Sequence, residues 1–196
     1  MGKLIVLMGK SASGKDTIFN LLKADKSLNL KQLIPYTTRP KRAGEREGEA
    51  YHFVTEEEFN LLLEKGRVIE HRSYHTIHGL WRYFTVEDEH LDLSSHSYIL
   101  IGTLEAYISI VEYFGKEQVV PVFVSLDDGL RLERALMRER EQQHPKYEEL
   151  CRRFLADSAD YSQEKIKAAG IEKIFENTSS EESAIKISAY IKEQLL

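Results

Sequence analysis

Apolar positions along the chain follow two patterns, short continuous runs and stretches with helical spacing. Leu4–Met8 is a continuous run that ends at a glycine, which predicts a strand buried on both faces. From Asp16 onward the apolar positions Ile18, Leu21 and Leu22 have helical spacing. A strand, a glycine-rich loop and a helix in this order predict the first part of a β-α-β unit.

The same two patterns continue to the end of the chain. Further strands are predicted at residues 31–36, 51–54, 68–73, 80–85, 98–101, 119–125 and 173–176. Helices are predicted at about 55–65, between 101 and about 114, and at about 127–143, 145–169 and 180–196, the first of them opened by a capping box of Thr55 and Glu58. Strands that alternate with helices predict an α/β fold around a parallel sheet, with a small additional unit where the strands between 31 and 85 are denser.

Composition narrows the classes of partner. A length of 196 residues fits one domain, and the 27 basic against 32 acidic residues leave a net charge of −5. This charge argues against a nucleic-acid polymer or an anionic membrane as the main partner. The single cysteine, Cys151, excludes an internal disulfide, and we expect it to be buried in a helix. Because no apolar run is long enough to cross a bilayer, we expect a cytoplasmic protein, of an oligomeric state that these patterns leave open.

The loop after the first strand carries the strongest chemical signal. Gly9 is followed by four residues and then by Gly14-Lys15, which is the spacing of a Walker A phosphate-binding loop, and it lies between a predicted strand and a predicted helix. Glycine allows the tight turn that points successive N–H groups at phosphate oxygens, and the helix N-terminus adds a positive potential. The residues predicted to bind ATP here are Gly9, Ser11, Ala12, Ser13, Gly14, Lys15, Asp16 and Thr17.

One position of this loop departs from the usual pattern. The residue after Lys15, where a magnesium-binding Ser or Thr is usual, is Asp16, and the hydroxyl comes one place later at Thr17. A Gly-Lys-X-Thr ending resembles adenylate kinases, where the hydroxyl is displaced in the same way. We therefore expect Mg²⁺ to be served either by Thr17 or by Asp16.

A second group of cations follows the predicted strand 31–36. Arg39, Lys41, Arg42 and Arg46 fall within eight positions of an otherwise acidic chain, and Tyr51 adds a phenol donor nearby. Arginine forks hold phosphate through two-point contacts, so this segment is a candidate second phosphate site. The alternative is a solvated charged loop.

Beyond these features, the sequence resembles the guanylate kinase family of P-loop nucleoside monophosphate kinases over nearly its whole length. The resemblance is carried by the phosphate loop, by Thr37-Thr38-Arg39 and Arg42-Ala43-Gly44-Glu45, by the strand Tyr51-His52-Phe53-Val54, by Glu70, and by arginines of the later helices. It implies one guanylate-kinase-like domain with a P-loop NTPase-type parallel sheet flanked by helices (1–32, 95–125 and 171–196). It also implies a small mixed α/β insert that binds the monophosphate (about 33–94) and a helical lid (about 126–156).

The resemblance also implies a reaction and a role for particular residues. The activity implied is ATP-dependent phosphorylation of GMP, with Arg39, Arg42 and Tyr51 on the GMP phosphate and Glu70 on guanine. A carboxylate can accept from both N1–H and the 2-amino group of guanine, whereas adenine has an acceptor at N1. The implied catalytic residues are Lys15 of the loop and Arg134, Arg138 and Arg153 of the lid, and Asn177 lies at a position beside the adenine of ATP. Arginines suit this task because phosphoryl transfer depends mainly on positioning and on neutralising dispersed charge.

Several positions on the acceptor side depart from the family pattern. Pro35 and Tyr36 replace small hydroxylic residues, His78 falls where a phosphate-binding tyrosine is expected, and Leu80 lies near the position of a hydroxyl that helps to read guanine. Ile101 and Thr103 replace a pair of aspartates. We keep His78 and Thr103 as candidate acceptor contacts, and we keep open a different phosphorylated acceptor of the same fold.

Two further interpretations belong to other classes of protein. The chain could be a non-catalytic guanylate-kinase-like binding module, although Gly14-Lys15 and the arginines argue against this. The histidines His71, His75 and His78 could form a zinc site, but the segment is predicted as strand and turn, and no cysteine ligand accompanies them.

Overall fold

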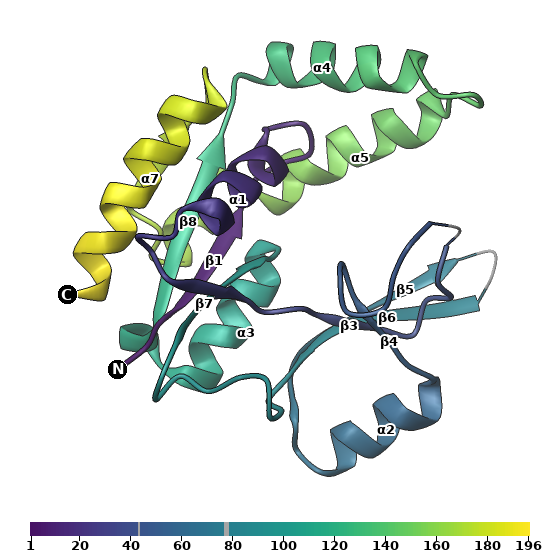
Figure 1. Ribbon diagram of the computed structural model, residues 1–196. Helices are drawn as coiled ribbons and strands as arrows, with labels where there is room; N and C mark the ends of the chain where they lie inside the picture. Colours follow the sequence, from purple (N-terminus) through teal and green to yellow (C-terminus); the bar gives the residue numbers. More distant parts are fainter. Residues whose placement is uncertain (43, 77–78) are drawn as a thin grey trace.

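The computed structural model describes residues 1–42, 44–76 and 79–196. Its core is a five-stranded parallel sheet with the strand order β2-β7-β1-β8-β9 (Figure 1). The strands span Leu30–Gln32 (β2), Ser97–Ile101 (β7), Leu4–Met8 (β1), Val119–Ser125 (β8) and Ile174–Glu176 (β9). β1 is central and completely buried, as its continuous apolar run predicts.

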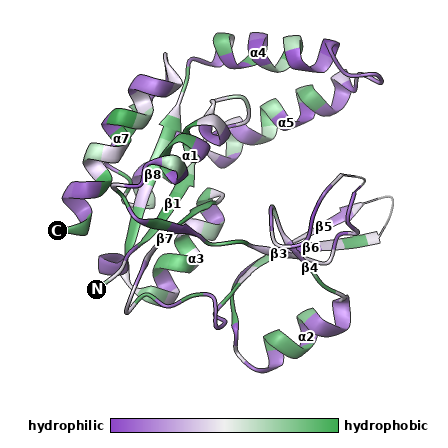
Figure 2. Cartoon of the chain, viewed as in Figure 1, coloured by the Kyte–Doolittle hydropathy of each residue, from purple (hydrophilic) through white to green (hydrophobic). Residues whose placement is uncertain are grey.

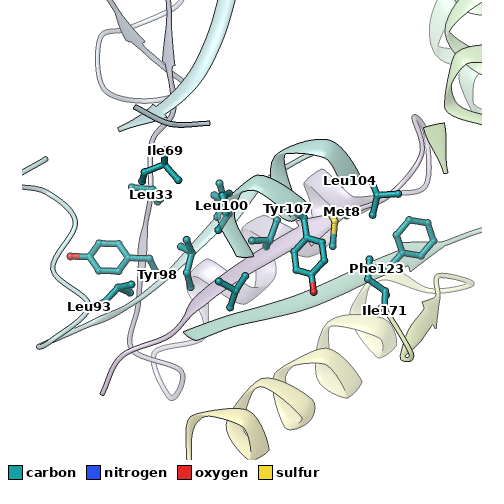
Figure 3. Packing of buried hydrophobic residues seen from close by; sticks show 14 of the residues in the cluster. Met8, Leu33, Ile69, Leu93, Tyr98, Leu100, Leu104, Tyr107, Phe123 and Ile171 are labelled. Carbon is teal, nitrogen blue, oxygen red and sulfur yellow. The ribbon is translucent and has the colours of Figure 1, made fainter. Parts of the chain in front are cut away.

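Helices cover both faces of this sheet. Ile5 and Leu7 of β1 pack with residues of α1 (Lys15–Ala24) and α7 (Ser180–Leu195). Leu4, Val6 and Met8 point to the opposite face and pack with α3 (Leu104–Phe114) and α6 (Gln163–Ala168), as Figure 3 shows for part of this cluster. A short 3₁₀ turn, η1 (Lys116–Gln118), links α3 to β8. The alternation of side chains along one strand therefore builds both halves of the core.

A second, four-stranded sheet has the order β4-β3-β6-β5 and projects to one side of the core (Figure 1). Its elements are β3 (Tyr36–Thr37), β4 (His52–Phe53), α2 (Glu56–Glu64), β5 (Val68–Thr76) and β6 (Gly79–Val86). It has its own small core, in which Phe59 of α2 packs on Phe84 and Val86. The capping box predicted at Thr55 is present, with Glu58 N–H donating to the threonine hydroxyl at 3.1 Å.

The strand predicted at 31–36 is wrong in extent, because the structure divides it between the two sheets. β2 pairs with β7 of the core, whereas β3 pairs with β6 of the small sheet. Pro35 stands between them and has no N–H to donate to a ladder, although its carbonyl accepts from His52 N–H at 2.9 Å. The proline therefore separates the two sheets at this point.

Two helices form an exposed hairpin beside the core, α4 (Asp128–Arg140) and α5 (Tyr147–Asp160). The single long helix predicted at 145–169 is wrong. α5 ends at Asp160, and α6 begins after Ser162, whose hydroxyl accepts from Lys165 N–H as an N-cap. The side chain of Tyr161 fills the break and is buried against Phe123.

Polarity follows this division of the molecule. In Figure 2 the hydrophobic colour concentrates on β1, β7 and β8, whereas the α4–α5 hairpin shows much of the hydrophilic colour.

Cys151 is exposed on α5, so the expectation that it is buried is wrong. Within the described residues, no helix is both long and apolar enough to cross a membrane.

Candidate active site

The glycine-rich loop joins the carboxyl end of β1 to the start of α1. Gly14 has φ 85° in the left-handed region, and a Cβ there would lie 2.2 Å from Asn177 Nδ2. Only glycine fits both restrictions at this position. α1 begins at the next residue, Lys15, so its free N–H groups open onto the loop.

Asn177 supports this loop from within the core. Its Nδ2 donates to the Ser13 carbonyl at 2.7 Å, and both residues are completely buried. Among the described residues, the Ser13 hydroxyl and Asn177 Oδ1 have no hydrogen-bond partner. Asn177 therefore positions the loop, and its predicted contact with adenine stays a prediction.

The end of the loop presents a cation and two oxygen donors. Lys15 Nζ lies 3.6 Å from Asp16 Oδ2, and Asp16 and Thr17 are exposed in the first turn of α1. Carboxylate and hydroxyl oxygens are ligands that Mg²⁺ accepts. The donor set fits the metal, and both predicted ligands remain candidates.

The α4–α5 hairpin contacts the same loop through Ser11. Arg153 Nη2 donates to the Ser11 hydroxyl at 3.3 Å, which brings one of the three predicted lid arginines to the loop. Asp157 Oδ2 accepts from the Ser11 N–H at 2.7 Å. Arg134 and Arg138 are exposed on α4.

Arg131 and Asp157 are contacts of the loop that the sequence analysis did not identify. Arg131 is 1% exposed, and its Nη1 donates to the Ser11 carbonyl at 2.8 Å. The same guanidinium lies 2.8 Å from Asp128 and 3.5 Å from Asp157, and it stacks 4.7 Å from the ring of Phe154. The three-residue spacing of Asp128 and Arg131 is typical of an ion pair within one helix, and it does not by itself point to a contact with the loop.

Arg39 forms a second cationic site, at the end of β3. It is 3% exposed, and its two terminal nitrogens donate to the two oxygens of Glu45 at 3.0 and 2.8 Å. Glu45 also accepts from the Arg42 N–H at 2.7 Å, and hydrogen bonds from Arg39 lower the pKa of Glu45 to about 2. The rings of Tyr51 and Phe53 each lie 5.6 Å from the guanidinium. Arg39 and Tyr51 are therefore neighbours, whereas the Arg42 side chain is exposed.

Glu70 is buried on the small sheet beside an arginine that the sequence analysis did not select. Its Oε1 accepts from the Thr85 hydroxyl at 2.8 Å and its Oε2 from Arg72 Nε at 3.2 Å. Arg72 Nη1 also reaches the hydroxyl of Thr103, at 3.3 Å, which caps α3. Arg72 therefore connects Glu70 of the small sheet with Thr103 at the start of α3, and both are predicted acceptor contacts.

The remaining predictions concern the histidines His71, His75 and His78. His78 lies outside the described residues. Within the described residues, no three His, Cys, Asp or Glu side chains are grouped to hold a metal ion, so the zinc interpretation of His71 and His75 has no support there.

A cavity of about 490 Å³ lies at the junction of the two sheets, lined by Lys31, Gln32, Leu33, Ile34, His52, Asp88, Glu89, His90, Asp92, His96 and Tyr98. It contains none of the predicted site residues.

Comparisons with known proteins agree with this geometry. A sequence model of the family described as guanylate kinase matches residues 1–82. The crystal structure of guanylate kinase from Anaplasma phagocytophilum superposes with a TM-score of 0.64 at 27% identity, covering 100% of this chain and 87% of that one. The chain has the amino-terminal sequence signature and the fold of the guanylate kinase family.

Curated relatives of the guanylate kinase family match in the same way. The guanylate kinase of Anaplasma phagocytophilum (strain HZ) is 28% identical over 98% of this chain and 87% of the relative. That of Malacoplasma penetrans (strain HF-2) is 45% identical over 35% of each chain. That of Wolbachia sp. subsp. Brugia malayi (strain TRS) is 34% identical over 63% of this chain and 61% of the relative. The shorter alignments are the more identical ones, and the likeness at lower identity extends along the whole chain.

Proposed function

We propose that this protein transfers the γ-phosphoryl group of ATP to a nucleoside monophosphate, with GMP as acceptor and GDP and ADP as products. The observation that carries this proposal is the presence of two phosphate-type sites in one chain. The Gly9–Thr17 loop lies at the end of β1, and the Arg39 site lies on the small sheet. A pure binding module has no use for the phosphate-loop lysine.

The small sheet with α2 is proposed as the acceptor-binding insert, and the α4–α5 hairpin as the lid. The loop N–H groups and Lys15 would hold the outer phosphates of ATP, while Arg39, Arg42 and Tyr51 hold the acceptor phosphate. An oxygen of the acceptor phosphate then attacks the γ-phosphorus, the bond to the β–γ bridging oxygen breaks, and ADP leaves. Because the transfer is direct, the protein needs no covalent intermediate.

The arginines of the hairpin and the residues at the start of α1 are proposed to neutralise the negative charge of the transferring phosphoryl group. Arg153 already reaches the loop, and closure of the hairpin would add Arg134 and Arg138 around the transferring group. Asp16 and Thr17 are the residues proposed to hold Mg²⁺, which supplies positive charge beside the phosphate oxygens. Closure also excludes water that would otherwise hydrolyse ATP.

Glu70 is the residue proposed to select guanine. An ionised carboxylate has about four acceptor sites, so Glu70 can still accept from N1–H and the 2-amino group of guanine while it binds Thr85 and Arg72. A carboxylate so placed favours guanine over adenine by about 1–3 kcal/mol.

An ADP-release assay with a panel of acceptors tests this proposal. We expect turnover with GMP well above that with AMP, CMP, UMP, IMP or ribose 5-phosphate. Turnover with a different member of the panel would support the kinase activity and would replace GMP as the proposed acceptor. Turnover with none of them, combined with no thermal stabilisation by ATP, would leave the binding-module interpretation.

A further inference from the structure

Arg72 lies where the small sheet meets the core, and the transfer as described above gives it no role. Its guanidinium donates from Nε to Glu70 at 3.2 Å and from Nη1 to Thr103 at 3.3 Å. Glu70 belongs to the small sheet and Thr103 to the start of α3 in the core. Arg72 therefore spans the junction between the proposed acceptor insert and the core.

Strand alternation places Arg72 on the acceptor side of the small sheet. Glu70 and Arg72 are two positions apart on β5, so their side chains share a face, and Arg72 is opposite Tyr83 on β6. Tyr83 contacts Tyr51, with ring centroids 5.5 Å apart, and Tyr51 is the neighbour of Arg39. One face of the sheet therefore runs from the phosphate-type site at Arg39 to the carboxylate of Glu70.

The positive charge of Arg72 affects the pKa values of two tyrosines, Tyr51 of the small sheet and Tyr161 of the core. Burial raises the pKa of Tyr51, and the positive charges of Arg39 and Arg72 oppose that rise. Burial also raises the pKa of Tyr161 to about 12, whereas hydrogen bonding with the backbone of Gly9 and the charge of Arg72 oppose that rise. The charge of Arg72 thus acts on a tyrosine of the acceptor-phosphate side and on a tyrosine that contacts the backbone of Gly9.

The guanidinium has donors left for a ligand. Two of its five N–H groups are used by Glu70 and Thr103 within the described residues, and its side chain is 16% exposed. The Nε–Oε2 bond holds the carboxylate and the guanidinium side by side. On guanine, the donors N1–H and 2-amino lie next to the acceptors O6 and N7 along one continuous edge, so a carboxylate beside an arginine fork matches that edge in order.

We propose that Arg72 is a specificity-determining residue that donates to O6 and N7 of the acceptor guanine while Glu70 accepts from N1–H and the 2-amino group. The inference rests on the proposed function, because it assumes a purine monophosphate on this face. An arginine fork on O6 and N7 is the most frequent specific protein contact to guanine. Adenine carries a 6-amino donor at that edge, and this donor would face the guanidinium.

The test compares acceptors that differ by single groups of the base. GMP, 7-deaza-GMP, which lacks N7, and IMP, which lacks the 2-amino group, are assayed with wild type, Arg72→Ala, Arg72→Lys and Glu70→Gln. The matched control is Arg82→Ala. Arg82 is also paired with a glutamate, Glu56 at 2.6 Å, but it lies opposite Ser73, whose side chain points to the other face of the sheet.

We expect wild type to prefer GMP over 7-deaza-GMP by about fivefold in kcat/KM, the loss of one hydrogen bond. Arg72→Ala and Arg72→Lys should lose that preference and keep most of the preference for GMP over IMP, whereas Glu70→Gln should do the reverse. Arg82→Ala should keep both preferences. Arg72→Lys retains a positive charge beside Glu70, so it carries the test if Arg72→Ala fails to fold.

Two outcomes would overturn the inference about Arg72, and a third would overturn the proposed function. If the Arg72 variants lose the preference for GMP over IMP and keep that over 7-deaza-GMP, Arg72 only positions Glu70, and the inference is overturned. Full recovery of the 7-deaza preference by lysine would also overturn it, because a charge without a fork would then suffice. If wild type binds and phosphorylates no purine monophosphate, the proposed function itself fails, and the inference fails with it.

Discussion

Asp157 accepts a hydrogen bond from the backbone N–H of Ser11 at 2.7 Å, although the two residues are 146 positions apart. The carboxylate thus occupies a donor of the phosphate loop, which is the kind of group that such a loop offers to phosphate oxygens. Arg131, at 3.5 Å, offsets part of its charge. The structure therefore has a side-chain anion at the place where the proposed function puts a nucleotide.

Replacing this carboxylate should strengthen ATP binding. Asp157→Asn removes a negative charge that would repel the phosphates and frees the Ser11 N–H more readily. We expect the Kd for ATP to fall about two- to fivefold, the effect of about 0.5–1 kcal/mol typical of a partly exposed charge. Isothermal titration calorimetry measures it, and Asp160→Asn on the same helix is the control. A higher Kd would mean that Asp157 holds the loop in its binding shape.

Lys15→Ala should abolish transfer and leave the fold intact. The side chain lies at the end of the loop, and its ion pair among the described residues is with the neighbouring Asp16 at 3.6 Å, so its loss breaks no ion pair between distant elements. We expect kcat/KM to fall by about 100-fold or more, since a charge aimed at the transferring group is lost. Lys23→Ala, at the other end of α1, is the matched control. An unchanged rate in Lys15→Ala would contradict the assignment of the loop.

Arg153 and Arg152 are adjacent on α5 and should behave differently. Arg153 reaches the Ser11 hydroxyl, whereas Arg152 pairs with Glu149 at 2.7 Å on the exposed helix surface. We expect Arg153→Ala to lower kcat by about 100-fold with a smaller change in KM, because its charge is needed mainly as the phosphoryl group transfers.

Arg152→Ala should stay close to wild type in the same steady-state assay. Equal losses in the two variants would indicate that the hairpin responds to its total charge rather than to a contact of Arg153. Arg138→Ala is expected to resemble Arg153→Ala, because closure would bring it to the same group. An effect of Arg138→Ala confined to KM would argue against that contact.

The pairing of Arg39 with Glu45 should make stability depend on pH in a defined window. Hydrogen bonds from Arg39 lower the pKa of Glu45 from 4.5 to about 2 in the folded protein. A lowered pKa means that the pairing stabilises the fold above about pH 4.5 and that this contribution is lost as the pH falls toward 2.

Thermal unfolding of wild type and Glu45→Gln measures this contribution. We expect the variant to have a lower Tm at pH 7 and the difference to shrink between pH 4.5 and pH 2. Glu49→Gln is the control, since the Glu49 side chain forms an exposed ion pair with Arg46 at 3.6 Å. A difference between wild type and Glu45→Gln that does not change with pH would place the effect of Glu45 in packing rather than in its charge.

Local features were predictable because they depend on neighbouring residues. The buried strand Leu4–Met8, the loop up to Lys15 and the capping box at Thr55 follow from apolar pattern, glycine spacing and hydrogen-bonding side chains within a few positions. The Arg39 site is local in the same sense, since Glu45 is six residues away. The boundaries failed where a single residue interrupts an otherwise regular pattern, at Pro35 and at Ser162.

The sequence by itself thus determined the chemistry that is available to this protein, the phosphate loop, the cations and the carboxylate of Glu70. Only the tertiary structure decided which of these groups meet. Arg72 reaches Thr103 across 31 positions, and Asp157 and Arg131 reach Ser11 across 146 and 120. On a helix or strand, a charged side chain with an opposite charge nearby has the same sequence pattern whether it is solvated or buried. Packing of distant elements removes water from some of these side chains and not from others. The spacing of neighbouring residues therefore does not predict which of them are buried.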